Sequence, residues 1–377
     1  LALLSLPAGL WIAINYDEIV YRINEVTNER VFIGIIAILL ILEACRRCIG
    51  IILVLVALVF ILYAKYSSYF PGILQGMDLS WGKTINYLYL DPNSMLSMLG
   101  LAATYGLAFV FLGQVLLKFG GGNALTNIAL LLFGRTRGGP AKAAVVGSSL
   151  AGTVSGAPVS NVFLTGSITI PMMKRAGYPA QYAAAIESVA SSGGQIMPPV
   201  MGIAAFLIAE RLSVPYMEVA MAAIIPAILY YVAVFVQVDL EAGKLGLRGL
   251  KKEELPVVKD TIYHVWPFII VIGLLIYMLF IKGMYAVTAG ALSGLLAIPI
   301  SMALKENRTN VIRKLLEVIE ETAELSLDVT SALAVAGLIV GAISVSGLGF
   351  TLGYILKLIG GNSLILLLLS AAIGSII

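Results

Sequence analysis

The sequence has little of what soluble proteins and most enzymes rely on. Charged residues make up 12% of the chain, whereas about a quarter of an ordinary soluble domain is charged. There is one histidine, and the two cysteines form the run Cys45-Arg-Arg-Cys48 without a second pair of metal ligands. The low charge argues against a soluble domain. The scarcity of histidine and cysteine argues against a metal centre, a redox centre or a catalytic cluster.

Motifs for nucleotides and nucleic acids are also missing. No segment matches G-x-x-x-x-G-K-[ST], so no phosphate-binding loop for ATP is expected. The formal net charge of +3 is small for 377 residues and gives no basic surface for nucleic acid. We therefore expect no cofactor, no ATPase subunit and no nucleic-acid partner, so energy for any active process must come from an ion gradient.

Apolar residues dominate the chain. They account for 60% of it, and the mean hydropathy is +0.98. A spanning helix needs about 20 apolar residues, so the apolar runs leave room for roughly nine or ten crossings and some shorter re-entrant pieces. These features predict an all-α polytopic membrane protein that contacts the lipid bilayer.

Polar and helix-breaking residues are concentrated in the apolar stretch from Gly147 to Met201. Two interruptions stand out, at Gly152–Asn161 and Ser191–Pro199, where Gly, Ser, Asn and Pro follow one another along the chain. In a bilayer, irregular backbone survives only where protein buries it or where it lines a watery cavity. The two interruptions are therefore predicted to form the walls of a binding site.

The positions of lysine and arginine predict how these segments are threaded. Most of them fall on one side of the predicted helices, which should be the cytoplasmic side. Lys142 and Lys174 bracket the first interruption on that side, so residues 141–173 should form a re-entrant hairpin. Residues 179–212 should cross once, as a helix broken at its centre.

An internal repeat indicates inverted symmetry. The run Lys118-Phe-Gly-Gly-Gly-Asn123 recurs as Lys357-Leu-Ile-Gly-Gly-Asn362, and the charge pattern gives the helices before the two copies opposite directions. Inverted repeats with broken helices near the midplane are typical of secondary transporters. The partner of the first hairpin would lie beyond the last residue, so we expect this chain to be a fragment that lacks its second hairpin.

The same residues carry a family resemblance. The run from Gly147 to Tyr178, together with Ser191-Ser-Gly-Gly-Gln-Ile-Met-Pro-Pro-Val200, resembles the large membrane subunit of the tripartite ATP-independent periplasmic (TRAP) transporters. The chain is most similar to the fused permeases associated with TAXI-type binding proteins, in which small and large subunits form one chain. One departure is the run Ser155-Gly-Ala-Pro-Val-Ser-Asn161, where the family more often has Ser-Gly-Ser-Ala-Val-Ala-Asn and thus no proline.

The resemblance implies a fold, an activity and a domain layout. It implies an inverted-repeat elevator fold, and import of an organic acid delivered by a periplasmic TAXI-type solute-binding protein and driven by a sodium gradient. The expected location is the bacterial or archaeal cytoplasmic (inner) membrane. The predicted parts are small-subunit-like helices (1–70), a periplasmic or interfacial connector (71–93), the first repeat of the large subunit (94–239), a cytoplasmic loop (240–263), and linking helices with the start of the second repeat (264–377).

Carbonyls freed by the two interruptions suit a hard cation, and half-helix N-termini favour an anionic group. The predicted cation- and substrate-binding residues are Gly152, Thr153, Ser155, Gly156, Ser160, Asn161, Ser191, Ser192, Gly193, Gly194, Gln195, Pro198 and Pro199. Glu187, an intramembrane carboxylate, is either a coupling group or a hydrogen-bonded structural group. The coupling ion is Na⁺ or H⁺, and no residue identifies the acid.

Two other functions are compatible with parts of the sequence. One is a stand-alone ion-coupled carboxylate symporter, which would work without a binding protein. The fused N-terminal helices and the Ser-Gly-Gly-Gln-Ile-Met-Pro-Pro run argue against it. The other is a membrane-embedded enzyme such as a lipid-modifying transferase, which the single histidine, far from any pair of carboxylates, disfavours.

Overall fold

The structure is a computed structural model that describes residues 2–360 and 363–376, with the side chains of 2–4, 155, 359–360 and 373–376 left out. Every element in these ranges is helical, and none of them is a strand. The chain divides into two compact units. Unit 1 comprises Leu1–Gly100 and Leu327–Ile377, and unit 2 comprises Leu101–Ser326.

The described residues include five helices that are long and apolar enough to cross a membrane, which agrees with the predicted all-α polytopic class. They are Ile51–Tyr69, Trp81–Lys118, Tyr216–Lys244, Lys252–Ile281 and Val311–Ser346. This is fewer than the nine or ten crossings predicted from apolar runs. The remaining apolar length lies in shorter helices, because glycine and proline interrupt the runs.

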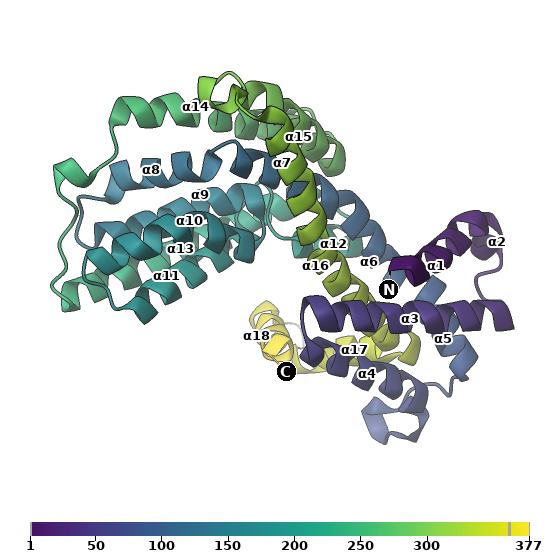
Figure 1. The fold of residues 1–377 in the computed structure, drawn as a ribbon. Helices are drawn as coiled ribbons and strands as arrows, with labels where there is room; N and C mark the ends of the chain where they lie inside the picture. Colours follow the sequence, from purple (N-terminus) through teal and green to yellow (C-terminus); the bar gives the residue numbers. More distant parts are fainter. Residues whose placement is uncertain (1, 361–362, 377) are drawn as a thin grey trace. The chain divides into compact units, whose positions relative to one another are not determined.

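Unit 1 is a group of helices around an apolar core. Figure 1 shows α3 beside α4 and α5, and residues of α1, α3, α4, α5 and α16 supply most of the core. Its elements are α1 (Ala2–Ile14), α2 (Tyr16–Tyr21), α3 (Asn28–Cys48), α4 (Ile51–Tyr66), η1 (Ser67–Tyr69), η2 (Gly72–Leu74), α5 (Trp81–Leu90), α6 (Met95–Leu101), the end of α16 (Val311–Ser346), α17 (Leu348–Gly360) and α18 (Leu364–Ile376).

Unit 2 carries both predicted interruptions. Figure 1 shows α9, α10, α11 and α13 side by side, and alanines that are fully buried on α9, α11 and α13 let these helices approach closely. The elements of unit 2 are η3 (Ala102–Gly106), α7 (Leu107–Lys118), α8 (Gly121–Phe133), α9 (Gly139–Ser155), α10 (Pro158–Arg175), α11 (Ala180–Ser192), η4 (Gly193–Ile196), α12 (Ile203–Leu212), α13 (Tyr216–Lys244), η5 (Lys252–Glu254), α14 (Val258–Ile276), η6 (Tyr277–Ile281), α15 (Ala286–Ser301), η7 (Lys305–Arg308) and the start of α16.

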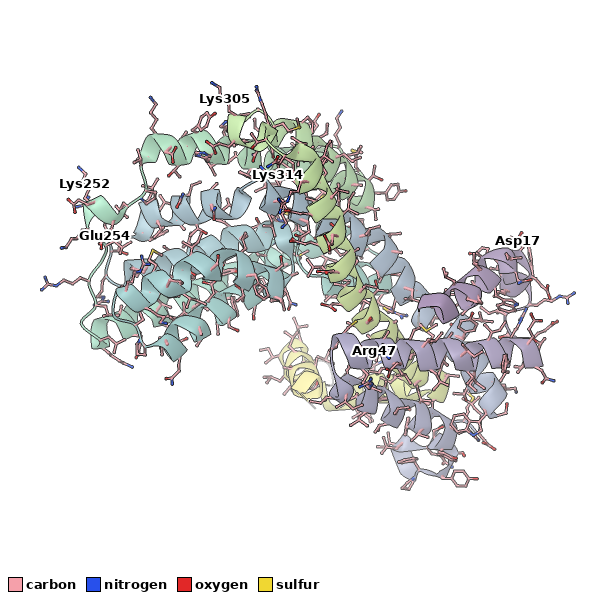
Figure 2. The ribbon with its side chains drawn as sticks, in the orientation of Figure 1. Asp17, Arg47, Lys252, Glu254, Lys305 and Lys314 are labelled. Atoms are coloured by element: carbon pink, nitrogen blue, oxygen red, sulfur yellow. The ribbon has the colours of Figure 1, made fainter. Side chains whose placement is uncertain are left out.

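Several charged side chains lie on the connections between helices of unit 2. Figure 2 shows Lys252 and Glu254 on the connection between α13 and α14, and Lys305 on the connection between α15 and α16. All three side chains belong to exposed residues. Lysines 252 and 305 belong to the set predicted to face the cytoplasm, so both connections carry the positive charge on which that orientation rests.

The units differ from the ranges predicted from the sequence. The range 264–377, predicted to hold linking helices and the start of the second repeat, is divided between them: 264–326 belong to unit 2 and 327–377 to unit 1. The reason is that α16 is one continuous helix. Near its start, Glu321 forms an ion pair with Lys118 at 2.5 Å, and further along Gly337 lies against Met95. Asn362, in the second copy of the repeated run, lies outside the described residues.

Candidate functional site

The first interruption is the turn of a helical hairpin. α9 ends at Ser155 and α10 begins at Pro158, so the turn falls within the predicted tip. Gly156 has a φ of 59°, and its N–H donates to the carbonyl of Gly152 at 3.1 Å. Glycine adopts this left-handed conformation without steric cost and is the common residue after a helix end. Pro158 suits the first turn of α10, where its missing N–H is not needed.

The second interruption separates α11 from α12. The short helix η4 follows α11 directly, and irregular backbone then runs from Met197 to Gly202. Pro198 and Pro199 cannot donate backbone hydrogen bonds, so they prevent the helix from continuing. The hydroxyl of Tyr216 lies 2.8 Å from the carbonyl oxygen of Pro199 and 2.6 Å from that of Val200. The irregular segment is thus held by a side chain from α13.

The two interruptions meet in space. A Cβ atom added to Gly152 would lie 2.5 Å from the Cα atom of Gly194. The backbone N–H of Val200 also donates to the carbonyl of Thr153 at 3.3 Å. Gly156 lies against the carbonyl group of Met201, where a Cβ would clash. The hairpin tip and the broken helix therefore form one continuous site.

Four helix ends converge at this contact. The C-termini of α9 and α11 lead into Gly156 and Gly193, and the N-termini of α10 and α12 begin just beyond the same breaks. A helix C-terminus carries about half an elementary negative charge, so the two C-termini together match roughly one positive charge. The two N-termini favour an anionic group. Neither interruption contains a charged residue, so these dipoles are the main polarity that the two segments themselves supply.

Asn161 is the side chain that faces this contact. It is fully buried, and its Nδ2 donates to the carbonyl of Ser148 at 2.8 Å. The same nitrogen would lie 3.5 Å from a Cβ atom on either Gly152 or Gly194. Its Oδ1 has no hydrogen-bond partner among the described residues. Amide and backbone carbonyl oxygens are ligands of hard cations, so this group is suited to hold one.

The structure brings most of the predicted residues to this site. Thr153, Ser160 and Ser191 are buried there, and Gly193 packs against the rings of two tyrosines of α13. Ser191 donates to a carboxylate oxygen of Glu187 at 3.3 Å, so its hydroxyl points away from the tip. Pro198 and Pro199 form part of the irregular segment described above.

Two predicted residues are exposed, and the side chain of a third is not described. Ser192 is exposed and donates to the carbonyl of Ser188 at 2.8 Å, within its own helix. Gln195 is also exposed, although its backbone carbonyl accepts from Gly202 at 2.7 Å. The side chain of Ser155 lies outside the described set. Polarity along the chain identified the break but could not tell which face of each helix end turns inward.

Glu187 is fully buried one turn before the second break, and the sequence did not show its partners. The hydroxyl of Ser148 donates to its Oε1 at 2.7 Å, and the hydroxyls of Thr165 and Thr169 also donate to the carboxylate. The spacing of the two threonines, four residues apart on one helix face, could have indicated them. Their common target on another helix could not be read from the sequence.

The base of the hairpin, at the start of α9, is joined to α13 by charge. Lys142, at the start of α9, is 7% exposed and lies 2.6 Å from a carboxylate oxygen of Asp239. Arg137 forms a second ion pair with the same carboxylate, and the Lys142 ammonium lies 5.2 Å from the ring centre of Phe235. At the other end, hydroxyls of α13 tyrosines donate to carbonyls of α11. Together these contacts make the helices around the site a single packed group.

Comparison with known proteins places the chain in a family. A profile described as "Tripartite ATP-independent periplasmic transporter, DctM component" matches residues 36–377. The C4-dicarboxylate TRAP transporter large permease protein DctM of Rhodobacter capsulatus is 25% identical over 245 residues, covering 59% of this chain and 54% of the relative. The 2,3-diketo-L-gulonate TRAP transporter large permease protein YiaN of Escherichia coli is 24% identical over 209 residues, covering 53% and 47%.

A third relative, the uncharacterized protein y4mL of Sinorhizobium fredii, is 33% identical over 121 residues, covering 32% of this chain and 28% of its own length. The chain thus spans about half the length of these relatives or less. The profile match begins at residue 36, inside the range predicted to be small-subunit-like. Since it covers most of the sequence, this chain belongs to the DctM component family of the tripartite ATP-independent periplasmic transporters.

Proposed function

We propose that this chain is the permease of a secondary transporter that imports an organic acid, using the inward gradient of a cation, in the first instance Na⁺. A member of this family is a multi-pass membrane transport protein and not an enzyme. The relatives come from bacteria, which favours the bacterial inner membrane. A periplasmic binding protein of the TAXI type would deliver the acid, and the fused N-terminal helices support that subtype.

One observation carries the cation part of this proposal. Beside the contact between Gly152 and Gly194, the buried side chain of Asn161 has an amide oxygen without a partner among the described residues, and the C-termini of α9 and α11 lead into the same two breaks. Backbone carbonyls and an amide oxygen, without a fixed charge, suit a monovalent cation that must bind and leave again. The nearby N-termini of α10 and α12 favour a carboxylate beside that cation.

In the proposed mechanism, the helices that carry the site move together as one rigid group. The packed group of α9, α10, α11 and α13 carries both interruptions, and its ion pairs and tyrosine bonds hold them together. An elevator motion requires such a group to cross without changing its internal contacts. Bound cation and acid would then travel together with the Gly152–Gly194 contact.

The test uses the full-length protein in proteoliposomes, with the binding protein outside and a panel of labelled organic acids. An inward Na⁺ gradient, an inward proton gradient and no gradient are compared, each with and without the binding protein. Uptake that needs both the Na⁺ gradient and the binding protein is the expected result. Uptake without the binding protein would instead show a stand-alone symporter, and uptake driven only by the proton gradient would reassign the coupling ion.

A further inference from the structure

The buried carboxylate of Glu187 joins three helices. It lies on α11 and is fully buried. Ser148 of α9 donates to Oε1 at 2.7 Å, and Ser191 of α11 donates to the same oxygen at 3.3 Å. From α10, Thr165 donates to Oε1 and Thr169 donates to Oε2. One side chain therefore fixes both arms of the hairpin against the helix that enters the second break.

No cation balances this carboxylate among the described residues. The ion pairs of unit 2 involve other acids, and the basic residues of the packed group, such as Lys142, Lys174 and Arg175, lie at helix ends. Among the described side chains, only hydroxyl groups donate to Glu187. A buried polar network of this kind is costly unless its members are satisfied, and when satisfied it specifies one arrangement of the helices. The arrangement it specifies includes the hairpin tip.

The network continues to the cation site through two of its members. The carbonyl oxygen of Ser148 accepts from Nδ2 of Asn161 at 2.8 Å, while its hydroxyl binds Glu187. The hydroxyl of Thr165 lies 2.9 Å from the backbone carbonyl oxygen of Asn161. Glu187 is thus linked through one intervening residue to both the side chain and the backbone of Asn161, whose Nδ2 lies beside the Gly152–Gly194 contact and whose Oδ1 has no partner among the described residues.

We propose that Glu187 is a positioning residue for the cation site, which acts through Ser148 and Thr165 on Asn161. This inference rests on the proposed cation-coupled function. In this proposal Glu187 does not carry the coupling charge. Its carboxylate accepts hydrogen bonds from hydroxyl groups and does not reach the hairpin tip itself. Loss of Glu187 then weakens cation binding by releasing the Asn161 amide from its orientation.

The first test measures Na⁺ binding without substrate. Purified full-length protein is titrated with NaCl at constant ionic strength made up with choline chloride, and the thermal stabilisation gives an apparent affinity. We expect Glu187→Ala to weaken that affinity by about tenfold or more, the scale seen when an outer hydrogen-bond partner of a metal ligand is lost. Glu187→Gln keeps one acceptor oxygen for Ser148 and Thr165, so its affinity should stay within about threefold of wild type.

A matched pair separates positioning from general stability. Thr165 and Thr169 are both fully buried on α10, and the hydroxyls of both bind Glu187. Each hydroxyl also lies within 3.0 Å of the backbone carbonyl oxygen four residues earlier in α10. Only Thr165 contacts Asn161. Thr165→Val should therefore weaken Na⁺ binding clearly more than Thr169→Val, although both should lower the melting temperature to a similar extent. This pair remains decisive if Glu187→Ala does not fold.

A double-mutant cycle completes the design. In an Asn161→Ala background, Glu187→Ala and Thr165→Val should have no further effect on Na⁺ affinity, since the group they position is gone. Provided that the wild type responds to Na⁺, two results would overturn the positioning role. One is an equal Na⁺ affinity of the two threonine variants, and the other is an unchanged Na⁺ affinity of folded Glu187→Ala. If wild type itself shows neither Na⁺ stabilisation nor Na⁺-driven uptake, the proposed function fails instead.

Discussion

Gly152 and Gly194 come so close that neither can carry a side chain. A Cβ on Gly152 would lie 2.5 Å from the Cα of Gly194, and a Cβ on Gly194 would lie 2.8 Å from the Cα of Gly152. Both obstacles are backbone atoms, which cannot move aside as a flexible side chain could. The approach of the two breaks, and hence the site between them, depends on glycine at both positions.

Gly152→Ala should therefore disable transport. Overpacking of a tight contact costs about 1–3 kcal/mol, and here that cost separates the two breaks. We expect a fall in the initial rate of uptake to near background and a lower melting temperature. Gly147→Ala is the control on the same helix, because its added Cβ would find its nearest neighbour at 3.6 Å, an ordinary contact. Wild-type uptake by Gly152→Ala would contradict the proposed site.

Asn161→Ala should raise the sodium requirement. It removes a buried amide oxygen that has no partner among the described residues, so the Na⁺ concentration for half-maximal uptake should rise by about tenfold or more. Gln114→Ala is a matched control. Gln114 lies on α7, is 3% exposed and also has an amide oxygen without a partner among the described residues. It should leave the sodium requirement unchanged. The site would lose its support if both variants shifted the requirement equally.

Tyr216→Phe should loosen the irregular segment of the broken helix. The variant keeps the ring stacked on Phe206, with ring centroids 4.3 Å apart, but it removes the hydroxyl that lies between the carbonyls of Pro199 and Val200. The loss of one such hydrogen bond costs about 1 kcal/mol of folding free energy, and uptake should fall with it. Tyr105→Phe serves as the control, since Tyr105 packs against the same ring of Phe206, with ring centroids 4.6 Å apart. Equal thermal stability of Tyr216→Phe and wild type would argue against this role.

Removal of Asp239 should destabilise the hairpin base more than removal of Lys142. In Asp239→Ala the nearly buried ammonium of Lys142 loses its anion, and an unpaired buried charge is costly. Lys142→Met removes that cation but keeps an apolar chain against Phe235, and Asp239 retains Arg137. The melting temperature of purified Asp239→Ala should therefore fall further below that of the wild type than the melting temperature of Lys142→Met. The reverse order would show that Lys142 is not held by this carboxylate.

Much of the site could be predicted because it consists of interruptions in apolar helices. Gly152, Asn161, Gly194 and the two prolines stand out in an apolar sequence, since such residues do not continue a membrane helix. The ion pairs of Glu43 with Arg46 and Arg47 were equally predictable from their spacing, and they form at 2.7 and 2.8 Å. Local chemistry along one segment is enough for features of this kind.

Other features could not be predicted, because they depend on which helix faces which. Ser192 and Gln195 lie in the predicted break but are exposed, whereas Ser148 and Thr165 lie outside it and contribute to the polar network. The grouping of residues 327–377 with unit 1 is also a property of packing. The direction in which α16 continues decides which core its second half joins.

The sequence by itself determined that this is a membrane protein, where its helices break, and which family it resembles, since hydrophobicity and helix-breaking residues act through the chain's own backbone. Only the tertiary structure decided that the two breaks touch at Gly152 and Gly194, that Asn161 faces this contact, and that Glu187 is held by hydroxyls from three helices. The physical reason is that these contacts join side chains far apart in the sequence, and hydrogen bonds and close packing depend on distances that only the folded chain sets.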